Sequence, residues 1–248
     1  MAFWEGASLW VLGNRPGASY PATAFHSHHA VQLTFALRGK ARLATHDHQL
    51  SADAMAIAPD TEHTFFGDEL IAHLFIEPEG VAGRALQRDL FSSAPLVSIP
   101  ASRVGDLPSC LLAWFDKPRR DDRTLLELGR ALVSALVPES ERDERPEVRI
   151  RRMSSWAAAR LTTPLTLADA AAHVGLSSGR ARHLFVEQTG LPFKKYVLWL
   201  RLNRAVELFS SGSSLTEAAH GAGFSDSSHL SRTFKRMFGI AADSLRVL

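Results

Sequence analysis

The 248-residue sequence has a single cysteine, Cys110, and no uninterrupted hydrophobic run near the roughly 18 residues that a membrane-spanning helix needs. One cysteine excludes an internal disulfide, a cysteine-built zinc site and a Cys-x-x-Cys redox pair. Because Cys110 lies in the apolar run Cys110-Leu111-Leu112-Ala113-Trp114, we expect a small buried side chain. The start, Met1-Ala2-Phe3-Trp4-Glu5, lacks the cationic and apolar segments of an export signal, which predicts a cytoplasmic protein with no membrane partner.

The familiar catalytic motifs are missing as well. The sequence has no Gly-x-Ser-x-Gly elbow, no phosphate-binding loop, no His-Glu-x-x-His and no dinucleotide fingerprint. At 46% hydrophobic and 22% charged residues, the chain is nevertheless apolar enough to bury a core and long enough for one to two domains. We therefore expect a globular protein that is not an enzyme.

Charge is distributed unevenly along the chain. Residues 1–146 carry 14 Lys or Arg against 19 Asp or Glu, a net charge of −5, whereas residues 147–248 carry 14 against 7, a net charge of +7. Of the 11 histidines, 7 lie between His26 and His73. An acidic, histidine-rich front and a basic rear predict two functions on one chain, and the basic part is where a polyanion would be attracted.

Hydrophobic patterning predicts strands at the front and helices behind them. Short apolar stretches between turn residues favour a β-sandwich or barrel over about 3–77, with strands at 32–39, 41–45, 54–59, 63–66 and 70–76. A polar turn is predicted between 41–45 and 54–59, and His46 and His48 in this turn are expected to be exposed. Helical periodicity follows at 81–91, 107–115 and 125–137. The charged, proline-bracketed segment 138–148 is predicted to be a linker, which makes residues 1–137 the first domain.

The rear contains an internal repeat, with residues 166–177 matching residues 214–225. Thr166 with Asp169, and Ser214 with Glu217, predict capping boxes at the start of a short helix. That helix contains Ala171 or Ala219, small enough for a close crossing, and four residues later Gly175 or Gly223 can take the positive φ of a sharp turn. Ser177 and Ser225 are predicted to cap the next helix. This pattern is typical of the helix-turn-helix.

The second helix of each repeat is predicted to present a polar face. The inner residues are Ala181, Leu184 and Phe185 in the first copy and Leu230, Phe234 and Phe238 in the second. The outward residues, which we predict to contact DNA, are Gly179, Arg180, Arg182, His183, Ser227, Ser228, Ser231 and Arg232. Such a helix fits the major groove, where Arg bonds guanine bidentately. The other interpretation, an all-helical repeat without a nucleic-acid role, does not account for the outward basic residues.

A long helix over 193–209 is predicted between the two copies, with Arg201 and Arg204 expected in solvent. As a fixed spacer it would place the two second helices in successive major-groove segments, about 34 Å apart.

The segment from about Arg149 to Arg246 resembles the DNA-binding domain of AraC/XylS-family transcription regulators. The matching marks are Leu167-x3-Ala171-x3-Gly175-Leu176-Ser177, Phe185-x4-Gly190-Leu191-Pro192-Phe193, Tyr196, Arg201-Leu202-x2-Ala205, Ala218-x4-Gly223-Phe224 and His229-Leu230-x-Arg232-x-Phe234-Lys235-x2-Phe238-Gly239. The resemblance implies that Gly179, Arg182, His183, Ser227, Ser228, Ser231 and Arg232 face the bases. Two departures are Ala242, where the family usually has proline, and Gly179, which has no side chain to read a base.

Residues 25–39 and 57–63 resemble the two motifs of cupin barrels. His26, His28 and Gln32 share strand parity and match the three ligand positions of the first motif, while His63 matches the fourth. The resemblance implies a site for a divalent transition metal, although Gln32 stands where metal-binding cupins have glutamate. A bound metal, a metal-free effector pocket and histidines that only hydrogen-bond stay open as interpretations. His29 has the opposite parity and is expected on the surface.

The expected fold class is therefore α+β with two domains: a cupin-like β-barrel with trailing helices, and an all-α domain, 149–248, with two helix-turn-helix units joined by a long helix. The leading function is a sequence-specific regulator that binds double-stranded DNA and senses a small molecule or metal. A homodimer through the first domain and RNA polymerase are further expected partners. The alternatives are a cupin metalloenzyme, of dioxygenase or isomerase type, fused to a DNA-binding domain, and a purely structural front domain.

Overall fold

A computed structural model describes residues 1–13, 22–137 and 147–247. These residues form two compact units. The first, here called the β unit, comprises residues 1–143 and 236–248, and the second, the helical unit, comprises residues 144–235. The predicted two-domain α+β class is confirmed. Residues 236–248, which the sequence analysis assigns to the C-terminal domain, are grouped with the β unit, and most of the predicted linker, residues 138–146, lies outside the described residues.

Strands of the β unit pair in two antiparallel sheets. The larger sheet has the order β1-β2-β8-β3-β6-β9, formed by β1 (Ala2–Trp4), β2 (Ala7–Gly13), β8 (Leu70–Ile76), β3 (Val31–Arg38), β6 (Ala54–Ile57) and β9 (Leu96–Ser98). The smaller sheet has the order β5-β4-β7, formed by β5 (Gln49–Ser51), β4 (Ala41–Ala44) and β7 (Thr64–Gly67). The strand pairing of the described residues does not close the sheet, so a cupin-like barrel stays a prediction.

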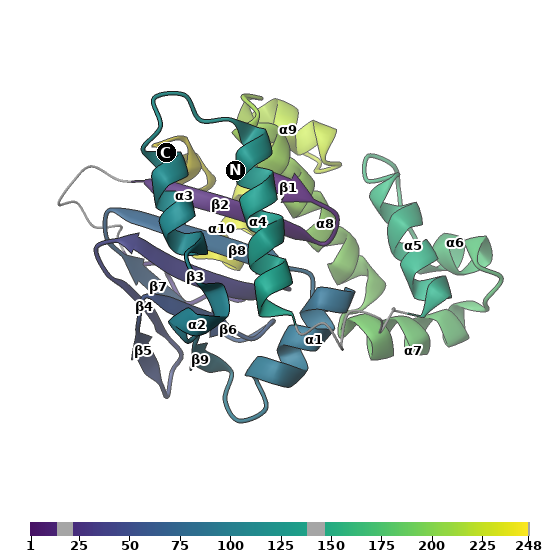
Figure 1. Cartoon of the computed structure of the whole chain (residues 1–248). Coiled ribbons are helices and arrows are strands. Elements are labelled where there is room, and N and C mark those ends of the chain that lie inside the picture. Colours follow the sequence, from purple (N-terminus) through teal and green to yellow (C-terminus); the bar gives the residue numbers. More distant parts are fainter. Residues whose placement is uncertain (14–21, 138–146, 248) are drawn as a thin grey trace. The chain divides into compact units, whose positions relative to one another are not determined.

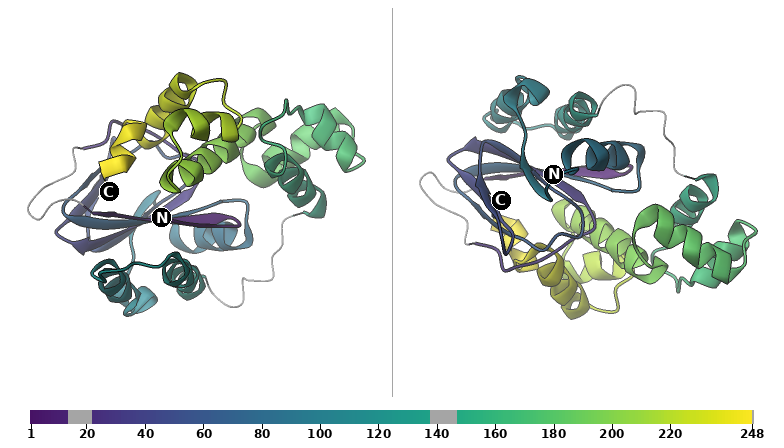
Figure 2. Two further views of the ribbon diagram at one scale, coloured as in Figure 1. Left: turned by 90° about the horizontal axis from the view of Figure 1, so that it is seen from above. Right: turned by 90° about the horizontal axis from the view of Figure 1, so that it is seen from below.

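One face of the six-stranded sheet is covered by helices. Leu9, Leu33, Phe35 and Leu74, which alternate with residues of the opposite face, are fully buried in the core of this unit. The covering helices are α1 (Val81–Leu90), α2 (Ala101–Val104), α3 (Leu107–Phe115) and α4 (Asp122–Leu136), and Figures 1 and 2 show α3 and α4 together on that side of the sheet. The helices predicted from periodicity are therefore present.

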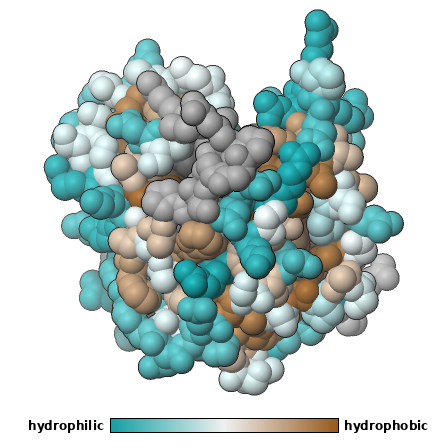
Figure 3. All heavy atoms as spheres, turned by 90° about the vertical axis from the view of Figure 1, so that its left-hand side faces the viewer, coloured by the Kyte–Doolittle hydropathy of each residue, from teal (hydrophilic) through white to brown (hydrophobic). Residues whose placement is uncertain are grey.

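The burial predicted for Cys110 is wrong. On α3 the buried residues are Leu111 and Trp114, which lie three apart on the inner stripe, and Cys110 is exposed. The turn residues His46 and His48 are exposed, as expected. The large hydrophobic side chains exposed among the described residues are Phe25, Val148 and Val186, and on the face drawn in Figure 3 hydrophilic residues separate the hydrophobic ones. No helix in the described part of the chain is long and apolar enough to cross a membrane.

The helical unit contains the repeat as two helix pairs. It comprises α5 (Val148–Ala158), α6 (Leu167–His173), α7 (Ser178–Thr189), α8 (Phe193–Ser210), α9 (Leu215–Gly221) and most of α10 (Ser227–Phe238). Fully buried alanines in the short first helices, Ala171 in α6 and Ala219 in α9, leave room for the second helices. Helix α8 joins the two pairs, as the sequence predicts.

Side chains cap the starts of these helices. Thr166 Oγ1 accepts from the backbone of Asp169, and Ser214 and Glu217 form a complete capping box. Ser177 caps α7 as predicted, since its Oγ accepts from Arg180 N. The predicted cap of α10 is wrong by one residue: Asp226 Oδ1, rather than Ser225, accepts from His229 N at 2.7 Å. A carboxylate is the stronger acceptor at a helix N-terminus, where the macrodipole favours negative charge.

The turns of the two pairs have the predicted glycine conformation, with φ of +70° at Gly175 and +83° at Gly223. Their surroundings differ. A Cβ at Gly175 would meet nothing within 4 Å, whereas one at Gly223 would overlap the carbonyl oxygen of Leu161. Arg201 Nε donates to the same oxygen at 2.9 Å, and Arg201 Nη2 donates to Thr163 O at 3.1 Å. The expectation of a solvated Arg201 is therefore wrong, because two carbonyls hold its guanidinium. Arg204 is 45% exposed and pairs with Glu207.

We expect Gly223→Ala to destabilise the protein much more than Gly175→Ala. Both substitutions place an L residue at positive φ, which costs about 1–2 kcal/mol. At Gly223 the methyl group must also displace the backbone of Leu161, so a total loss of about 3 kcal/mol or more is expected. Denaturant unfolding of both variants measures the difference, and equal losses would contradict the close approach.

Candidate functional site

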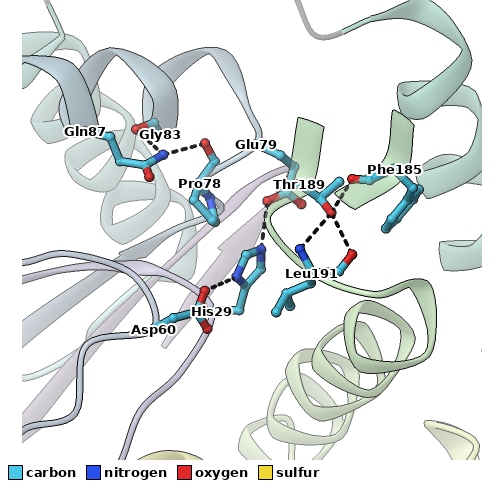
Figure 4. A network of polar contacts seen from close by, with 9 residues as sticks. All are labelled: His29, Asp60, Pro78, Glu79, Gly83, Gln87, Phe185, Thr189 and Leu191. Carbon is cyan, nitrogen blue, oxygen red and sulfur yellow. Dashed lines mark hydrogen bonds and ion pairs between the residues drawn. The ribbon is translucent and has the colours of Figure 1, made fainter. Parts of the chain in front are cut away.

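The outer face of α7 carries the predicted DNA-contacting residues of the first helix pair. Gly179, Arg180, Arg182 and His183 are all exposed, while Ala181, Leu184 and Phe185 are buried. In Figure 4, Thr189 Oγ1 donates to Phe185 O at the end of this helix, and Leu191 N donates to Thr189 Oγ1. The end of α7 is thus closed by hydrogen bonds, and its first two turns present cationic side chains to solvent.

Helix α10 presents the corresponding residues of the second pair. Ser228 and Arg232 are exposed, and Ser227 and Ser231 are half-buried. Leu230 and Phe234 are buried on the inner side, as predicted. Phe238 is buried too, but in the β unit: its ring centroid lies 5.0 Å from that of Trp10 and 5.7 Å from that of Phe75. Its predicted place in the core of the helix-turn-helix is therefore wrong.

A second candidate site lies in the β unit, where two separate segments bring three histidines together. His26 and His63 form an antiparallel bridge, with both backbone N–H···O bonds at 2.9 Å, and Asp60 N donates to His28 O at 3.0 Å. Asp60 holds the turn at φ of +57°, a conformation that Asp tolerates. The three imidazoles are buried, and one nitrogen of each lies within 4.8 Å of the others.

Hydrogen bonds assign the tautomer of each imidazole in this histidine cluster, defined as His26, His28 and His63. A carbonyl oxygen only accepts, so His26 Nδ1 donates to Ala24 O and His63 Nδ1 donates to Thr61 O, each at 2.8 Å. His28 Nε2 donates to Gln32 Oε1 at 2.8 Å. The lone pairs are therefore on His26 Nε2, His28 Nδ1 and His63 Nε2. The last of these atoms is buried and has no hydrogen-bond partner among the described residues.

Burial keeps these imidazoles neutral. It lowers the pKa of His26, and together with the nearby His26 it lowers the pKa of His28 to about 3. Burial, with His28 and His26 close by, holds the pKa of His63 well below its usual value. Three neutral imidazoles with their second nitrogens tied to oxygen acceptors match the way proteins prepare histidine for a divalent transition metal. The donor set therefore fits a metal, although without an anionic ligand.

Gln32 supports the cluster rather than completing it. While its Oε1 accepts from His28, its Nε2 donates to Thr34 Oγ1 at 3.0 Å, and Thr34 Oγ1 lies 3.0 Å from His73 Nδ1. In the six-stranded sheet Thr34 and Trp10 both stand opposite His73, and Gln32 and Ser8 both stand opposite Phe75, so these residues share one face. His73, Trp10 and Phe75 are absent from the site predicted from the sequence, although the parity of β8, which separates His73 and Phe75 from Leu74, points to His73 and Phe75.

The prediction that His29 lies on the surface is wrong. His29 is 3% exposed, with Nδ1 2.9 Å from Asp60 Oδ2 and Nε2 3.4 Å from Glu79 Oε2, and Figure 4 shows its ring between the two carboxylates. Burial lowers the pKa of His29, but the hydrogen bonds and charges of Asp60 and Glu79 outweigh it and raise the pKa to about 9. His29 is therefore a buried cation held by two anions.

Comparisons with known proteins agree with the repeat. Residues 150–246 match the family described as a helix-turn-helix domain. The chain is 24% identical over 230 residues to the Msm operon regulatory protein of Streptococcus mutans, covering 86% of this chain and 83% of that protein. It is 38% identical over 81 residues to the helix-turn-helix-type transcriptional regulator YidL of Escherichia coli, covering 32% of this chain and 27% of that protein.

The whole fold is similar to that of ToxT from Vibrio cholerae. One ToxT structure gives a TM-score of 0.61 at 14% identity, covering 98% of this chain and 99% of that one. A ToxT structure bound to an unsaturated fatty acid gives a TM-score of 0.59 at 14% identity, covering 99% and 98%. At this identity the likeness concerns the fold.

The repeat, its capped helix pairs and the matched residues define a DNA-binding helix-turn-helix protein. Residues 150–246 of the chain form a helix-turn-helix domain of the AraC type, and a unit built around a β-sheet precedes this domain.

Substitution of the exposed arginines tests the DNA-contacting face. Arg182→Ala and Arg232→Ala should each cost about 1–3 kcal/mol of binding to the cognate site and relax the base preference at one position. Arg123→Ala, at an 88% exposed position in the β unit, is the control and should leave DNA binding unchanged. Competition binding with single-base variants of the site is the measurement; an equal loss on every sequence would show that the arginine contacts phosphate instead.

The pH dependence of stability tests the ion pairs of His29 with Asp60 and Glu79. The folded-state pKa of about 9 lies above the ordinary value of 6.5, so this group stabilises the fold fully below pH 6.5, and the contribution disappears as the pH rises through 9. His29→Gln should reduce the loss of stability between pH 6.5 and 9, a window in which the buried Glu77, with its pKa raised to about 8 by burial and by Glu79, also titrates. It should also lower the free energy of unfolding at pH 6.5 by about 3–5 kcal/mol. Exposed His46→Gln is the control in denaturant unfolding, and an unchanged pH profile in His29→Gln would refute the assignment.

Proposed function

We propose that the chain is a sequence-specific transcription regulator that binds double-stranded DNA through α7 and α10 and senses a metal ion or small molecule at the histidine cluster. The observation that supports DNA reading best is the pair of matched helix-turn-helix units, whose second helices expose Arg182, His183, Ser228 and Arg232. Gly179, Arg180, Ser227 and Ser231 complete the proposed contact surface. One chain then carries two unequal reading units, so its DNA site need not be palindromic.

The proposed metal would be held by His26 Nε2, His28 Nδ1 and His63 Nε2, and it would act there as a Lewis acid. Gln32 would orient His28 rather than coordinate, since its amide oxygen accepts the Nε2–H of that ring. Ala24 O and Thr61 O would orient the other two imidazoles. With three neutral ligands and no carboxylate, a bound divalent ion would keep its full charge, which predicts weaker binding than in a site with glutamate.

A small organic effector is the other form of the same proposal. The histidine cluster adjoins aromatic rings, with the ring of Phe75 5.2 Å from that of His28 and the ring of Trp10 4.8 Å from that of Phe75. Apolar walls with a few buried polar groups are typical of small-molecule sites. The fold relative ToxT has been seen with an unsaturated fatty acid bound, which supports an apolar effector in a fold of this kind.

The alternative of a cupin metalloenzyme is less well supported. Such an enzyme would need Gln32, or an anion in its place, among the metal ligands, and here the Gln32 amide is engaged by His28 and Thr34. The relatives found by sequence are transcription regulators. Self-association through the β unit and contact with RNA polymerase stay predictions.

Titration with metal separates these forms of the proposal. Zinc or nickel binding followed by calorimetry on the full chain should be lost in His63→Ala and strengthened at least about tenfold in Gln32→Glu, because a carboxylate in this place both adds charge and can accept the His28 proton. His48→Ala, an exposed histidine outside the cluster, is the control. Equal metal binding by wild type and His63→Ala would refute the metal form and leave the organic effector.

Selection of DNA from random fragments by the purified full chain tests the regulatory function itself. A recurring sequence should emerge, and its affinity should fall steeply as salt is added, because cationic side chains release counterions from the phosphates they neutralise. Binding without any sequence preference would refute the proposed function.

A further inference from the structure

The histidine cluster gathers hydrogen-bond acceptors that carry no charge. The carbonyl oxygens of Ala24 and Thr61 and the amide oxygen of Gln32 accept one N–H from each of the three rings, so the other nitrogen of each neutral ring can only accept. One nitrogen of each ring lies within 4.8 Å of the others. His63, which is 1% exposed, has no partner for Nε2 in the part of the chain that the structure describes. A buried acceptor without a partner costs free energy, which a donor on a ligand would recover.

The acidic side chains next to the cluster in sequence are engaged elsewhere. Asp60 Oδ2 lies 2.9 Å from His29 Nδ1, and Glu62 Oε2 lies 3.0 Å from His46 Nε2. The cluster itself therefore offers only the negative ends of neutral dipoles. A carboxylate or phosphate on a ligand would face lone pairs there and be repelled, whereas a group with N–H or O–H donors would be attracted.

The number of acceptors selects the ligand group. A hydroxyl donates one hydrogen bond and a primary amide donates two from one nitrogen, and both groups also carry an acceptor oxygen. A primary ammonium donates three hydrogen bonds from one nitrogen and accepts none. Among these groups, only the ammonium can satisfy all three imidazoles from a single atom.

The spacing of the rings fits the same group. Three nitrogens at the 4.8 Å limit of their separation surround a centre that lies about 2.8 Å from each of them. This is the length of a charge-assisted hydrogen bond, about 2.7–2.9 Å, whereas a metal–nitrogen bond to imidazole measures about 2.0–2.1 Å. Shorter separations move the ammonium nitrogen out of the plane of the acceptors without lengthening a bond. An ammonium therefore fits without the contraction that a metal ion requires.

Aromatic rings beside the cluster can hold the organic part of such a ligand. Phe75 packs edge-on against His28, with ring centroids 5.2 Å apart, and Trp10 packs against Phe75 at 4.8 Å. Trp10 Nε1 donates to Ser8 Oγ at 3.0 Å, so the indole N–H is already used and the ring offers apolar surface. Aromatic faces also attract a cation within about 6 Å.

We propose that the histidine cluster binds the ammonium group of a primary amine, with His26, His28 and His63 as the three acceptors and Trp10 and Phe75 beside the apolar body of the ligand. This rests on the proposed function, since it names the chemical class of the small organic effector. Because the cluster supplies no counterion, the affinity depends on all three hydrogen bonds and falls sharply when one of them is removed.

Ligands with one six-carbon chain and four head groups test the proposal on the full chain. At neutral pH hexylamine is protonated and donates three hydrogen bonds, hexyltrimethylammonium keeps the charge and donates none, 1-hexanol donates one, and hexanoate only accepts. Calorimetric titration gives each dissociation constant. We expect hexylamine to bind at least about tenfold more tightly than each of the other three, because a hydrogen bond from a charged donor is worth about tenfold or more in affinity.

Histidine variants locate the site. His63→Ala and His26→Ala each remove one acceptor and should weaken hexylamine binding at least about tenfold. His48→Ala, at an exposed histidine outside the cluster, is the matched control and should bind hexylamine as wild type does. Thermal unfolding shows whether each variant is folded, and the comparison of head groups on wild type does not depend on any variant.

The ammonium site is refuted if hexylamine binds no more tightly than hexanol or hexanoate. Equal binding of hexyltrimethylammonium would refute it too, since charge and aromatic contact would then suffice without N–H donors. Wild-type affinity for hexylamine in folded His63→Ala would have the same consequence.

Selection of DNA by wild type separates the ammonium site from the function on which it rests. If a DNA sequence is selected and hexylamine is not preferred, the regulatory function stands without an amine effector. If hexylamine binds as expected and no DNA sequence is selected, the amine site stands and the regulatory function fails.

Discussion

The contact between Gly223 and the carbonyl of Leu161 is the constraint on which the helical unit depends. The turn of the second helix pair rests on the loop before the first pair, so closely that no side chain fits at Gly223. Arg201, from α8, donates to the same carbonyl and to that of Thr163. The loop that contains Leu161 and Thr163 therefore contacts both the turn at Gly223 and the Arg201 guanidinium of α8. This fixes the spacing of the two helix pairs, without which two reading helices could not engage one duplex together.

In the β unit the corresponding constraint is the tautomer of each histidine. Ala24, Thr61 and Gln32 accept one N–H from each ring, and burial prevents a second proton from binding. The positions of the lone pairs are thereby fixed, which would reduce the reorganisation that binding of the proposed metal ion or small molecule requires. His29, one residue from His28, has the opposite state, because two carboxylates keep it charged. Two adjacent residues thus belong to different environments, His28 to the neutral histidine cluster and His29 to a buried ion pair.

Much of this could be predicted where the information is local. Helix periods, capping residues and the repeat predict α6 to α10 and their outward residues, since each depends on neighbours within a few positions. His26, His28 and His63 could be placed together from a resemblance to known motifs. The predictions that failed depend on distant partners: His29 is buried by Glu79, Arg201 is held by Leu161, and Phe238 packs on Trp10. No local pattern records such contacts. The predictions of a buried Cys110 and of a cap at Ser225 failed for a different reason. Each was wrong by one residue, the first in placing the buried face of a helix and the second in placing the cap, which is Asp226.

The two helix pairs are proposed to read one duplex side by side. Hydroxyl-radical footprinting of the full chain on its selected site tests this most directly. We expect two protected stretches on one face of the DNA, about 34 Å or one helical turn apart, with Arg182→Ala weakening one stretch and Arg232→Ala the other. A single protected stretch, weakened equally by either substitution, would contradict it.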